Sequence, residues 1–362
     1  MAKERERLAT KPKIKSTKVD KNKLDIELQG LASISKDIKV SAVSVTEQEL
    51  KFLVDLYYQL QQHRIGMENQ IRSIVQGYDE GEINPAIAWV KESFKNDENQ
   101  IKKMLHEYAK GTPVGRWLLD INGIGPVYAA ALISYFDITK VNHQTQFWSY
   151  AGLNDNNNPW LGTTGAKKEI AALKEEFPEF AKAKEIPDEV IYSICHKTHR
   201  TFANVVKGAK NNSGIITWTS LEKYLAKPPY NKDVKTLMWK IGQNFTKISY
   251  KEESLYGRLY RERKAYEVEK NLNGDYADQA AAALEKYNIG KDTDAYKAYS
   301  EGRLPDAHIN RRAQRVAVKI FISHLFEAMW YHEYHEEPEK PYVLQYLGHS
   351  DYIYPEVDYR DY

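Results

Sequence analysis

Two heptad-spaced apolar series, separated by a short break, constrain the fold of this 362-residue chain most strongly. Thr46 and Glu49 have the spacing of a helix-starting capping box immediately before the first series. The first series is Leu50, Leu53, Tyr57, Leu60, Arg64, Met67, Ile71 and Ile74, and the second is Ile87, Val90, Phe94, Asp97, Ile101, Met104 and Tyr108. Alternating steps of three and four residues align side chains along one side of a helix. We therefore expect residues 46–110 to form an antiparallel coiled-coil hairpin.

Polar residues interrupt both series, at Arg64 in the first and at Asp97 in the second. A single polar residue in a coiled-coil interface selects the register or the partner. The hairpin can fold on itself or pair with a second copy. We favour a homodimer through residues 46–110.

A second feature follows the hairpin, in the apolar stretch from Trp117 to Phe136. Two glycines, Gly123 and Gly125, allow positive φ in a turn, and Pro126 suits the first position of the next helix. The pattern predicts a helix-hairpin-helix whose second helix begins with free backbone amides, which suit an anion. The candidate contacts to a nucleic-acid phosphate are Gly123, Ile124, Gly125 and Tyr128. The alternative is a turn that closes a helical hairpin inside the protein.

Composition limits the class of protein. Hydrophobic residues make up 42% of the chain and aromatic residues 12%, enough for a packed core, and no apolar run approaches the roughly 20 residues that span a bilayer. The first residues lack the apolar segment of a signal peptide. We expect a cytoplasmic, nucleoid-associated protein with no membrane partner. Cys195 is the single cysteine, so an intramolecular disulfide is excluded.

Charge is distributed unevenly between the two ends. Residues 1–24 carry nine Lys or Arg against three acidic residues, whereas residues 331–362 carry two against eight. A basic arm attracts polyanions and an acidic tail repels them. The other interpretation is that both ends are solvated. Residues 1–45 are expected to be a basic arm and extended lead-in, with one or two short strands in 25–45, and 332–362 an acidic, Tyr-rich tail.

Residues 111–260 are expected to be one helical domain interrupted by an insertion near 154–227. The insertion begins with a loop rich in Asn and Gly that ends at Lys167 and Lys168, both candidate phosphate contacts, although such runs are usually plain turns. It also holds Cys195, His196 and His199, and His332, His335 and Glu336 lie near the end of the chain. Either group is short of the four ligands of a structural zinc site. We therefore predict no metal site.

Residues 261–331 are expected to be a helical extension. One long exposed helix and a connection should occupy 254–300, and a strong helix should run from Asp306, a good N-cap, to about Tyr331. This last helix carries the candidate phosphate contacts Arg311, Arg312, Arg315 and Lys319. Aligned cations of this kind position a protein on a phosphate backbone, but a solvated helix face has the same pattern.

The order of these motifs resembles a known family. The chain is similar to the C-terminal domain of the DEDD insertion-sequence transposases in the order of four features. These are a coiled-coil hairpin, INGIGP at 121–126 with Ala129-Ala130, YAGL at 150–153, and a helix that opens with Tyr230-Asn231 and contains Val234-Lys235 and Leu237. The resemblance covers roughly residues 46–260. It implies DNA recombination, with a RuvC-like nuclease in the N-terminal half and a nucleophilic serine in the C-terminal half.

The chain also departs from that family. Only 45 residues precede the coiled coil, too few for a RuvC-like half with its four acids, so we expect that nuclease to be absent. We expect no cofactor, with Mg²⁺ only if a partner nuclease domain is supplied. The resemblance implies that the family serine lies at Ser213 in Asn212-Ser213-Gly214, the only candidate catalytic residue. The other interpretation, which we favour, is a turn serine beside Gly214. Tyr230 and Lys235 replace a glycine and an arginine of the family pattern, and no base that would activate Ser213 is visible.

Three functional hypotheses follow. The first is a transposase-related DNA-binding protein in recombination or mobile-element biology, with structured RNA as an alternative ligand. The second is an active, serine-dependent recombinase half that needs a partner nuclease domain. The third is a non-catalytic coiled-coil scaffold. The predicted fold is mainly α in all three.

Overall fold

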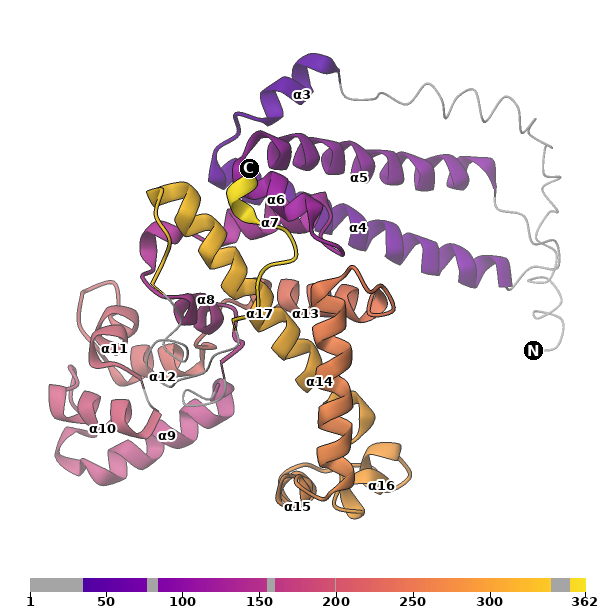
Figure 1. Ribbon diagram of the computed structural model, residues 1–362. Helices are drawn as coiled ribbons and strands as arrows, with labels where there is room; N and C mark the ends of the chain where they lie inside the picture. Colours follow the sequence, from indigo (N-terminus) through magenta and orange to yellow (C-terminus); the bar gives the residue numbers. More distant parts are fainter. Residues whose placement is uncertain (1–34, 77–83, 155–159, 199, 340–351) are drawn as a thin grey trace, which may run out of the picture. The chain divides into compact units, whose positions relative to one another are not determined.

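The computed structural model describes residues 35–76, 84–154, 160–198, 200–339 and 352–362 (Figure 1). Within these ranges there are 15 α-helices, and the only β-type pairing is an isolated antiparallel bridge between Lys210 and Ile216. The prediction of a mainly α protein is confirmed. No described helix combines the length and apolar character needed to cross a membrane. The basic arm, residues 1–24, lies outside the described residues.

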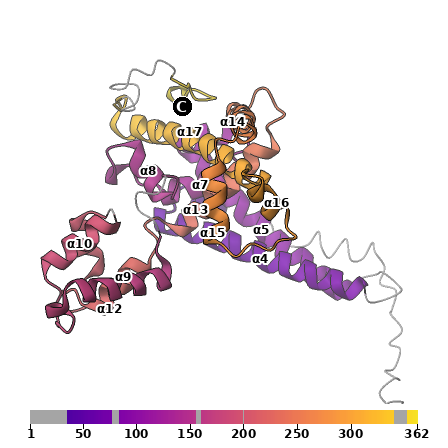
Figure 2. The same ribbon diagram turned by 90° about the horizontal axis from the view of Figure 1, so that it is seen from below.

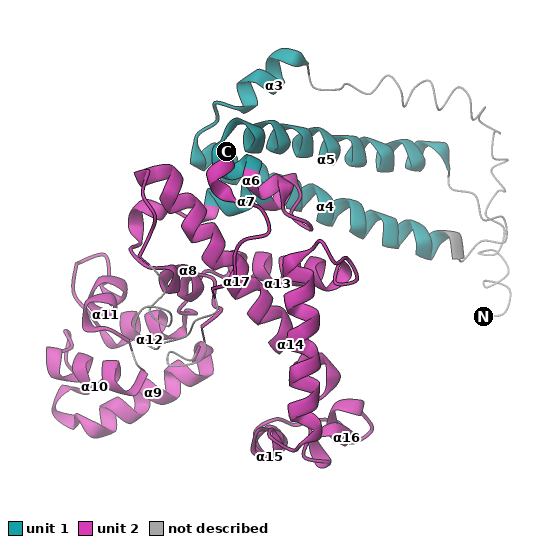
Figure 3. Cartoon of the chain, viewed as in Figure 1, with its two compact units in different colours: residues 1–116, 129–134 teal, residues 117–128, 135–362 magenta. Residues whose placement is uncertain are grey.

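The chain divides into two compact units, coloured separately in Figure 3. The first comprises residues 1–116 and 129–134, and the second comprises residues 117–128 and 135–362.

The first unit begins with the short helix α3 (Lys36–Ala42). The side chain of Ser35 accepts a hydrogen bond from the Ile38 amide at 3.2 Å and caps the helix. Asp37 in the first turn favours the positive end of the helix dipole. The expectation of a strand or extended chain is therefore wrong for residues 36–42, because local capping outweighs the weak alternation of apolar residues.

Helices α4 (Glu47–Gln76) and α5 (Pro85–Gly111) pack side by side in the first unit (Figures 1 and 2). The predicted capping box starts α4: the Thr46 amide donates to Glu49 Oε2 at 2.8 Å, and the Glu49 amide donates to Thr46 Oγ1 at 3.3 Å. Arg64 pairs with Glu98 and Glu68 with Lys91, so residue numbers rise on one helix as they fall on the other. The pair is therefore antiparallel.

The side chains buried between α4 and α5 match only about every second member of the two predicted heptad series. The buried residues of the pair are Leu50, Val54, Tyr57 and Ile71 on α4 and Glu98, Ile101, Leu105, Tyr108 and Ala109 on α5. Residues that were expected inside, such as Leu53 and Leu60, are only partly buried. Asp97 is exposed and its neighbour Glu98 is buried, so the prediction of Asp97 as the polar interface residue is wrong. Both choices give steps of three and four, and spacing alone does not separate them.

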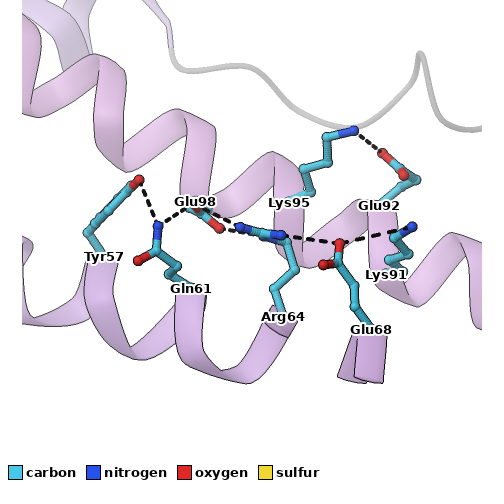
Figure 4. A network of polar contacts seen from close by, with 8 residues as sticks. All are labelled: Tyr57, Gln61, Arg64, Glu68, Lys91, Glu92, Lys95 and Glu98. Atoms are coloured by element: carbon cyan, nitrogen blue, oxygen red, sulfur yellow. Dashed lines mark hydrogen bonds and ion pairs between the residues drawn. The ribbon is translucent and has the colours of Figure 1, made fainter. Parts of the chain in front are cut away.

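A polar layer occupies the middle of this interface (Figure 4). Arg64 Nε donates to Glu98 Oε2 at 2.7 Å, and Arg64 Nη1 donates to Glu68 Oε1 at 3.1 Å. Gln61 Nε2 adds a 3.3 Å hydrogen bond to Glu98 Oε1. Burial raises the pKa of Glu98, but the hydrogen bond and charge of Arg64 outweigh burial and hold the pKa below its usual value. Because a shifted register would leave Glu98 buried without a cation, the layer fixes the pairing of the two helices.

The core of the second unit forms around α17 (Asp306–Tyr334), which packs against α13 (Lys232–Lys247) and α14 (Leu255–Leu272). Phe245, Tyr256 and Phe321, one from each helix, meet with ring centroids 5.0–5.6 Å apart. Helix α17 begins at Asp306 as predicted, but Pro305 is the N-cap and Asp306 lies in the first turn.

Residues 254–300 differ from the expected long exposed helix. They form α14, which packs on α17, then α15 (Ala277–Lys286) and α16 (Asp294–Ser300). The Asn273 amide ends α14 by bonding to the Glu269 carbonyl, and Gly274 adopts a positive φ of 85°. That turn places Tyr276 against Glu267, with a 2.5 Å hydrogen bond between them.

The segment predicted as an insertion, residues 154–227, is helical and has its own apolar core. It contains α9 (Gly162–Glu176), α10 (Asp188–Thr198), α11 (Phe202–Ala209) and α12 (Trp218–Ala226). Their buried residues include Ala166, Leu173, Ile194, Val205 and Leu221. Helix α9 includes Lys167 and Lys168, so the expectation that these lysines belong to a loop is wrong. Residues 155–159 of that loop lie outside the described residues.

The C-terminal residues 352–362 pack against the last third of α17. His324 Nε2 donates to the Ile353 carbonyl at 2.8 Å, so its Nδ1 accepts from the Tyr256 hydroxyl at 2.9 Å. The Tyr352 hydroxyl donates to Glu327 at 2.5 Å. For these residues the expectation of a solvated acidic tail is wrong, because its tyrosines and carboxylates make specific bonds within the protein.

Glu327 makes the attachment of this tail sensitive to pH. Burial raises its pKa from 4.5 to about 7, against the opposing effect of the Tyr352 hydrogen bond. A raised pKa contributes stability that is complete below pH 4.5 and is lost as pH rises through 7.

We predict that Glu327→Gln, which keeps an acceptor for Tyr352, removes this loss. Between about pH 5 and about pH 8, the wild-type free energy of unfolding should fall by up to about 3 kcal/mol relative to the variant, at about 1.4 kcal/mol per pKa unit. Urea unfolding across this range measures the difference. Glu339→Gln, at an exposed glutamate, is the control, and parallel curves for wild type and Glu327→Gln would contradict the assignment.

Candidate nucleic-acid interface

The predicted helix-hairpin-helix turn lies between α6 (Pro113–Asp120) and α7 (Pro126–Tyr135). Gly123 has a positive φ of 88°, as the sequence suggested. Its carbonyl accepts a 3.0 Å hydrogen bond from the side chain of Asn244 on α13. A Cβ at Gly123 would lie 2.9 Å from Ile248 Cδ1. Gly123 therefore serves the packing of the turn against α13, and Ile124 is buried.

The chain itself supplies an anion to this turn, the carboxylate of Glu356. Its Oε1 accepts from the Asn122 amide at 2.8 Å and from the Asn122 side chain at 2.7 Å. Its Oε2 accepts from the Leu255 amide at 2.8 Å, at the first residue of α14. The turn thus binds an anion, as its expected preference suggests, but this anion is the protein's own Glu356 carboxylate at Asn122. Glu356 lies 234 residues away in sequence, and no local pattern indicates it.

Gly125 remains the open part of the turn. A Cβ built on Gly125 would meet no heavy atom within 4 Å. Pro126 begins α7, as predicted. Tyr128, the fourth candidate here, is half-buried, and burial raises the pKa of its phenol. Of the four predicted contacts in the turn, Gly125 is the one with space for a ligand atom beside it.

Arg312, on α17, points to an internal partner. Its Nε donates to Glu267 Oε2 at 2.6 Å, and Glu267 is 1% exposed. Burial raises the pKa of Glu267, but hydrogen bonds from Tyr276, Arg312 and Arg263 outweigh it and lower the pKa overall. Arg312 therefore compensates a buried charge. Its role differs from that of the other three candidate phosphate contacts on α17.

The remaining cations, Arg311, Arg315 and Lys319, form what we call the basic ridge. They are spaced i, i+4 and i+8 on α17, in steps of about 6 Å. The Arg311 guanidinium lies 5.1 Å from the ring centroid of Trp239 on α13. The Lys319 ammonium lies 5.1 Å from that of Trp148 on α8 (Gln144–Tyr150). Tryptophans from two neighbouring helices thus hold the cations at both ends of the ridge.

The structure brings together two distant motifs of the second unit, YAGL at 150–153 and Tyr230-Asn231. The Asn231 amide donates to the Tyr150 carbonyl at 2.9 Å, and the Asn231 side chain donates to the Tyr150 hydroxyl at 2.9 Å. Gly152 has a positive φ of 65°, and a Cβ there would lie 2.9 Å from the Tyr230 ring. The Lys235 ammonium lies 4.0 Å from the centroid of the Tyr230 ring. These motifs therefore position the start of α13, which carries Trp239.

Sequence reasoning missed Trp239 and Trp148 as partners of the ridge. A tryptophan on an otherwise polar helix face, such as Trp239 beside Lys235 and Lys240, was the available signal. Lys167 and Lys168 are exposed on α9, and no described contact joins them to the turn or the ridge.

Ser213, the candidate nucleophile, has the contacts of a turn residue. Its amide donates to Asn211 Oδ1 at 2.9 Å, and Gly214 follows with a positive φ of 78°. The serine is exposed, and within the described residues no His, Lys or carboxylate bonds to its hydroxyl. An activated serine requires such a base.

The candidate metal ligands have other surroundings. Cys195 is buried, burial raises its pKa, and His196 is exposed beside it. His332 pairs with the Tyr359 carbonyl at 2.8 Å, and His335 ends α17 with a positive φ of 56°. The described part of the chain has no group of three or more His, Cys, Asp or Glu able to hold a metal ion. His199 lies outside it.

Comparisons with models of known protein families, with curated proteins and with solved structures find no match to this chain. Its function is therefore inferred from its own residues.

The two glycines of the turn should respond differently to the same substitution. Gly123→Ser forces a side chain into positive φ and against Ile248, and should cost about 1–3 kcal/mol of stability. Gly125→Ser adds a side chain in open space and should change stability by at most about 0.5 kcal/mol. Denaturant unfolding of both variants measures this. Equal losses would show that Gly125 is also a packing position.

Proposed function

We propose that this chain is a transposase-related DNA-binding protein that acts in recombination or mobile-element biology in the cytoplasm. The observation that carries the proposal is the basic ridge, whose two end cations are held over tryptophans of neighbouring helices. Cations fixed in this way meet a phosphate backbone without first losing side-chain freedom.

In this proposal the basic ridge supplies positive charge, and the turn lets a phosphate come close to the protein backbone. Arg311, Arg315 and Lys319 extend over about 12 Å of α17, and Gly125 leaves the start of α7 open. Phosphate contacts of this kind fix position and orientation and read no sequence. The resemblance to the DEDD transposases supports the assignment through residues 121–126 and 150–153, and structured RNA remains the alternative ligand.

We infer a role without catalysis by this chain alone. Ser213 lies in an Asx turn, and none of the residues that the structure describes bonds to its hydroxyl as a base, which weighs against the active recombinase half. Such a half would also need acids and Mg²⁺ from a partner nuclease domain.

The salt dependence of binding tests the ridge. Each cation that contacts a phosphate contributes roughly 0.9 to the slope of log affinity against log salt concentration. The triple change of Arg311, Arg315 and Lys319 to Ala should therefore flatten the slope for duplex DNA by about two to three units. Fluorescence anisotropy at several salt concentrations measures it.

Lys95, Lys102 and Lys103, exposed on α5, provide a matched control of equal charge. Their triple change to Ala should leave the slope unaltered. If the ridge variant and this control gave the same slope as wild type, the ridge would have no part in DNA binding.

The hairpin of α4 and α5 favours a second component of the proposal, a homodimer through residues 46–110. Beside the inward residues runs an apolar flank, which we define as Leu53, Leu60, Met67, Ile74, Val90 and Met104. They recur every seven residues on α4, and each of Leu53, Leu60 and Met67 precedes an inward residue by one position. Ile74 is 51% exposed and Val90 is 40% exposed. A second copy would cover this flank and extend the helix pair into a bundle.

Three aspartate substitutions on α4 test the dimer. Leu60→Asp should produce a folded monomer, because it places a charge on the flank without disturbing the buried contacts of the pair. Leu50→Asp, at a fully buried residue, should unfold the hairpin, and Phe52→Asp, at an exposed residue off the flank, should leave the dimer intact. Sedimentation at tens of micromolar with circular dichroism separates these results. A wild-type monomer at that concentration would contradict the dimer and favour a hairpin that is complete by itself.

A further inference from the structure

Trp239 is the most exposed aromatic side chain beside the basic ridge. It is 47% exposed on α13, although α13 buries the apolar residues around it, Val234, Leu237, Met238 and Ile241. The packing of the apolar face of α13 therefore does not explain why a tryptophan stands at position 239. The Arg311 guanidinium lies near its ring at 5.1 Å and links it to α17.

Helices α13 and α17 approach closely at this place, which fixes Trp239 relative to the ridge. A Cβ on Gly242 would lie 3.3 Å from Gln314 Cβ and 3.4 Å from Val318 Cγ2. Gln314 Nε2 donates to Thr246 Oγ1 at 2.8 Å, and Gln243 Nε2 donates to Gln314 Oε1 at 3.2 Å. The close packing of the two helices thus places the aromatic ring and the cations on one surface.

Trp148 gives the other end of the ridge a second fixed ring. Its indole Nε1 donates to the Lys319 carbonyl at 3.1 Å, which sets the orientation of the ring, and the Lys319 ammonium lies near the ring. The surface therefore has an aromatic ring at each end and three positive charges along α17: Trp239 beside Arg311, then Arg315, then Lys319 beside Trp148.

We propose that this surface binds single-stranded nucleic acid, with an unpaired base stacked on the Trp239–Arg311 pair and phosphates on Arg315 and Lys319. Unpaired bases expose a π face that stacks on indole rings and on guanidinium planes. In a duplex the base faces are stacked on one another, so an exposed tryptophan adds little there. The inference rests on the proposed function, because it assigns a ligand class to the same ridge.

The experiment compares an oligo-thymidylate, an oligo-uridylate and a duplex of equal length, all at one salt concentration. Stacking of one base contributes about 1–3 kcal/mol, so Trp239→Ala should weaken binding to both single strands roughly 5- to 150-fold. It should leave duplex binding within about twofold, because phosphate contacts remain. Trp239→Phe, which keeps an aromatic face, should recover part of the single-strand affinity.

Two further variants complete the comparison. Arg315→Ala should weaken single-strand and duplex binding alike, and Trp89→Ala, at a similarly exposed tryptophan on α5, should change neither. Circular dichroism checks that each variant is folded. An effect of Trp239→Ala confined to one single strand would contradict stacking that accepts any base face, because the two strands differ only in the 2′-hydroxyl and in the C5-methyl group of the base.

The possible failures are distinguishable. If the wild type binds duplex and Trp239→Ala changes all affinities equally or none, the single-strand inference is wrong and the proposed DNA-binding function stands. If the wild type binds no nucleic acid at all, both are wrong.

Discussion

Buried carboxylates determine much of this structure, because an ionised group removed from water must find a compensating partner. Glu98 pairs with Arg64 across the α4–α5 interface, and Glu267 bonds to Arg312 and Tyr276. The partly buried Glu356 accepts hydrogen bonds from two backbone amides. Glu327 accepts a hydrogen bond from the Tyr352 hydroxyl, and burial raises its pKa to about 7. Each case fixes a register or a connection that apolar packing leaves open.

The same requirement decides which charges are left for a ligand. Arg312 and Arg311 are adjacent in sequence, yet Arg312 turns towards Glu267 while Arg311 turns towards Trp239 on the outer face. The division is a consequence of helical geometry, since adjacent residues are about 100° apart around the axis. Likewise, Glu356 uses the Asn122 amide of the turn and leaves Gly125 open.

The sequence predicted the elements better than their faces. The mainly α fold, the capping box at Thr46, the start of α17 at Asp306 and the positive φ of Gly123 all follow from local rules. The heptad pattern predicted Asp97 in place of Glu98, because the lines 97-101-104-108 and 98-101-105-108 along α5 both follow steps of three and four residues and share Ile101 and Tyr108. The line that faces α4 includes Glu98, whose partner Arg64 is 34 residues away in sequence. The candidate site shows the same limit: the ridge cations were visible, but the tryptophans that hold them come from other helices.

Glu356 and a phosphate differ in what they offer to the hairpin turn, and this difference bears on how the protein would bind nucleic acid. Glu356 reaches Asn122 as part of a chain segment already held through Tyr352 and Ile353, so its carboxylate binds at a high effective concentration. A phosphate from solution would have to displace it and would leave the Leu255 amide without its acceptor. The basic ridge offers side-chain cations instead, and two of them lie beside tryptophan rings. Under the proposed function, the binding of nucleic acid should therefore depend more on side-chain cations than on the backbone amide of Asn122. Long-range electrostatic attraction should dominate the association of nucleic acid with the protein.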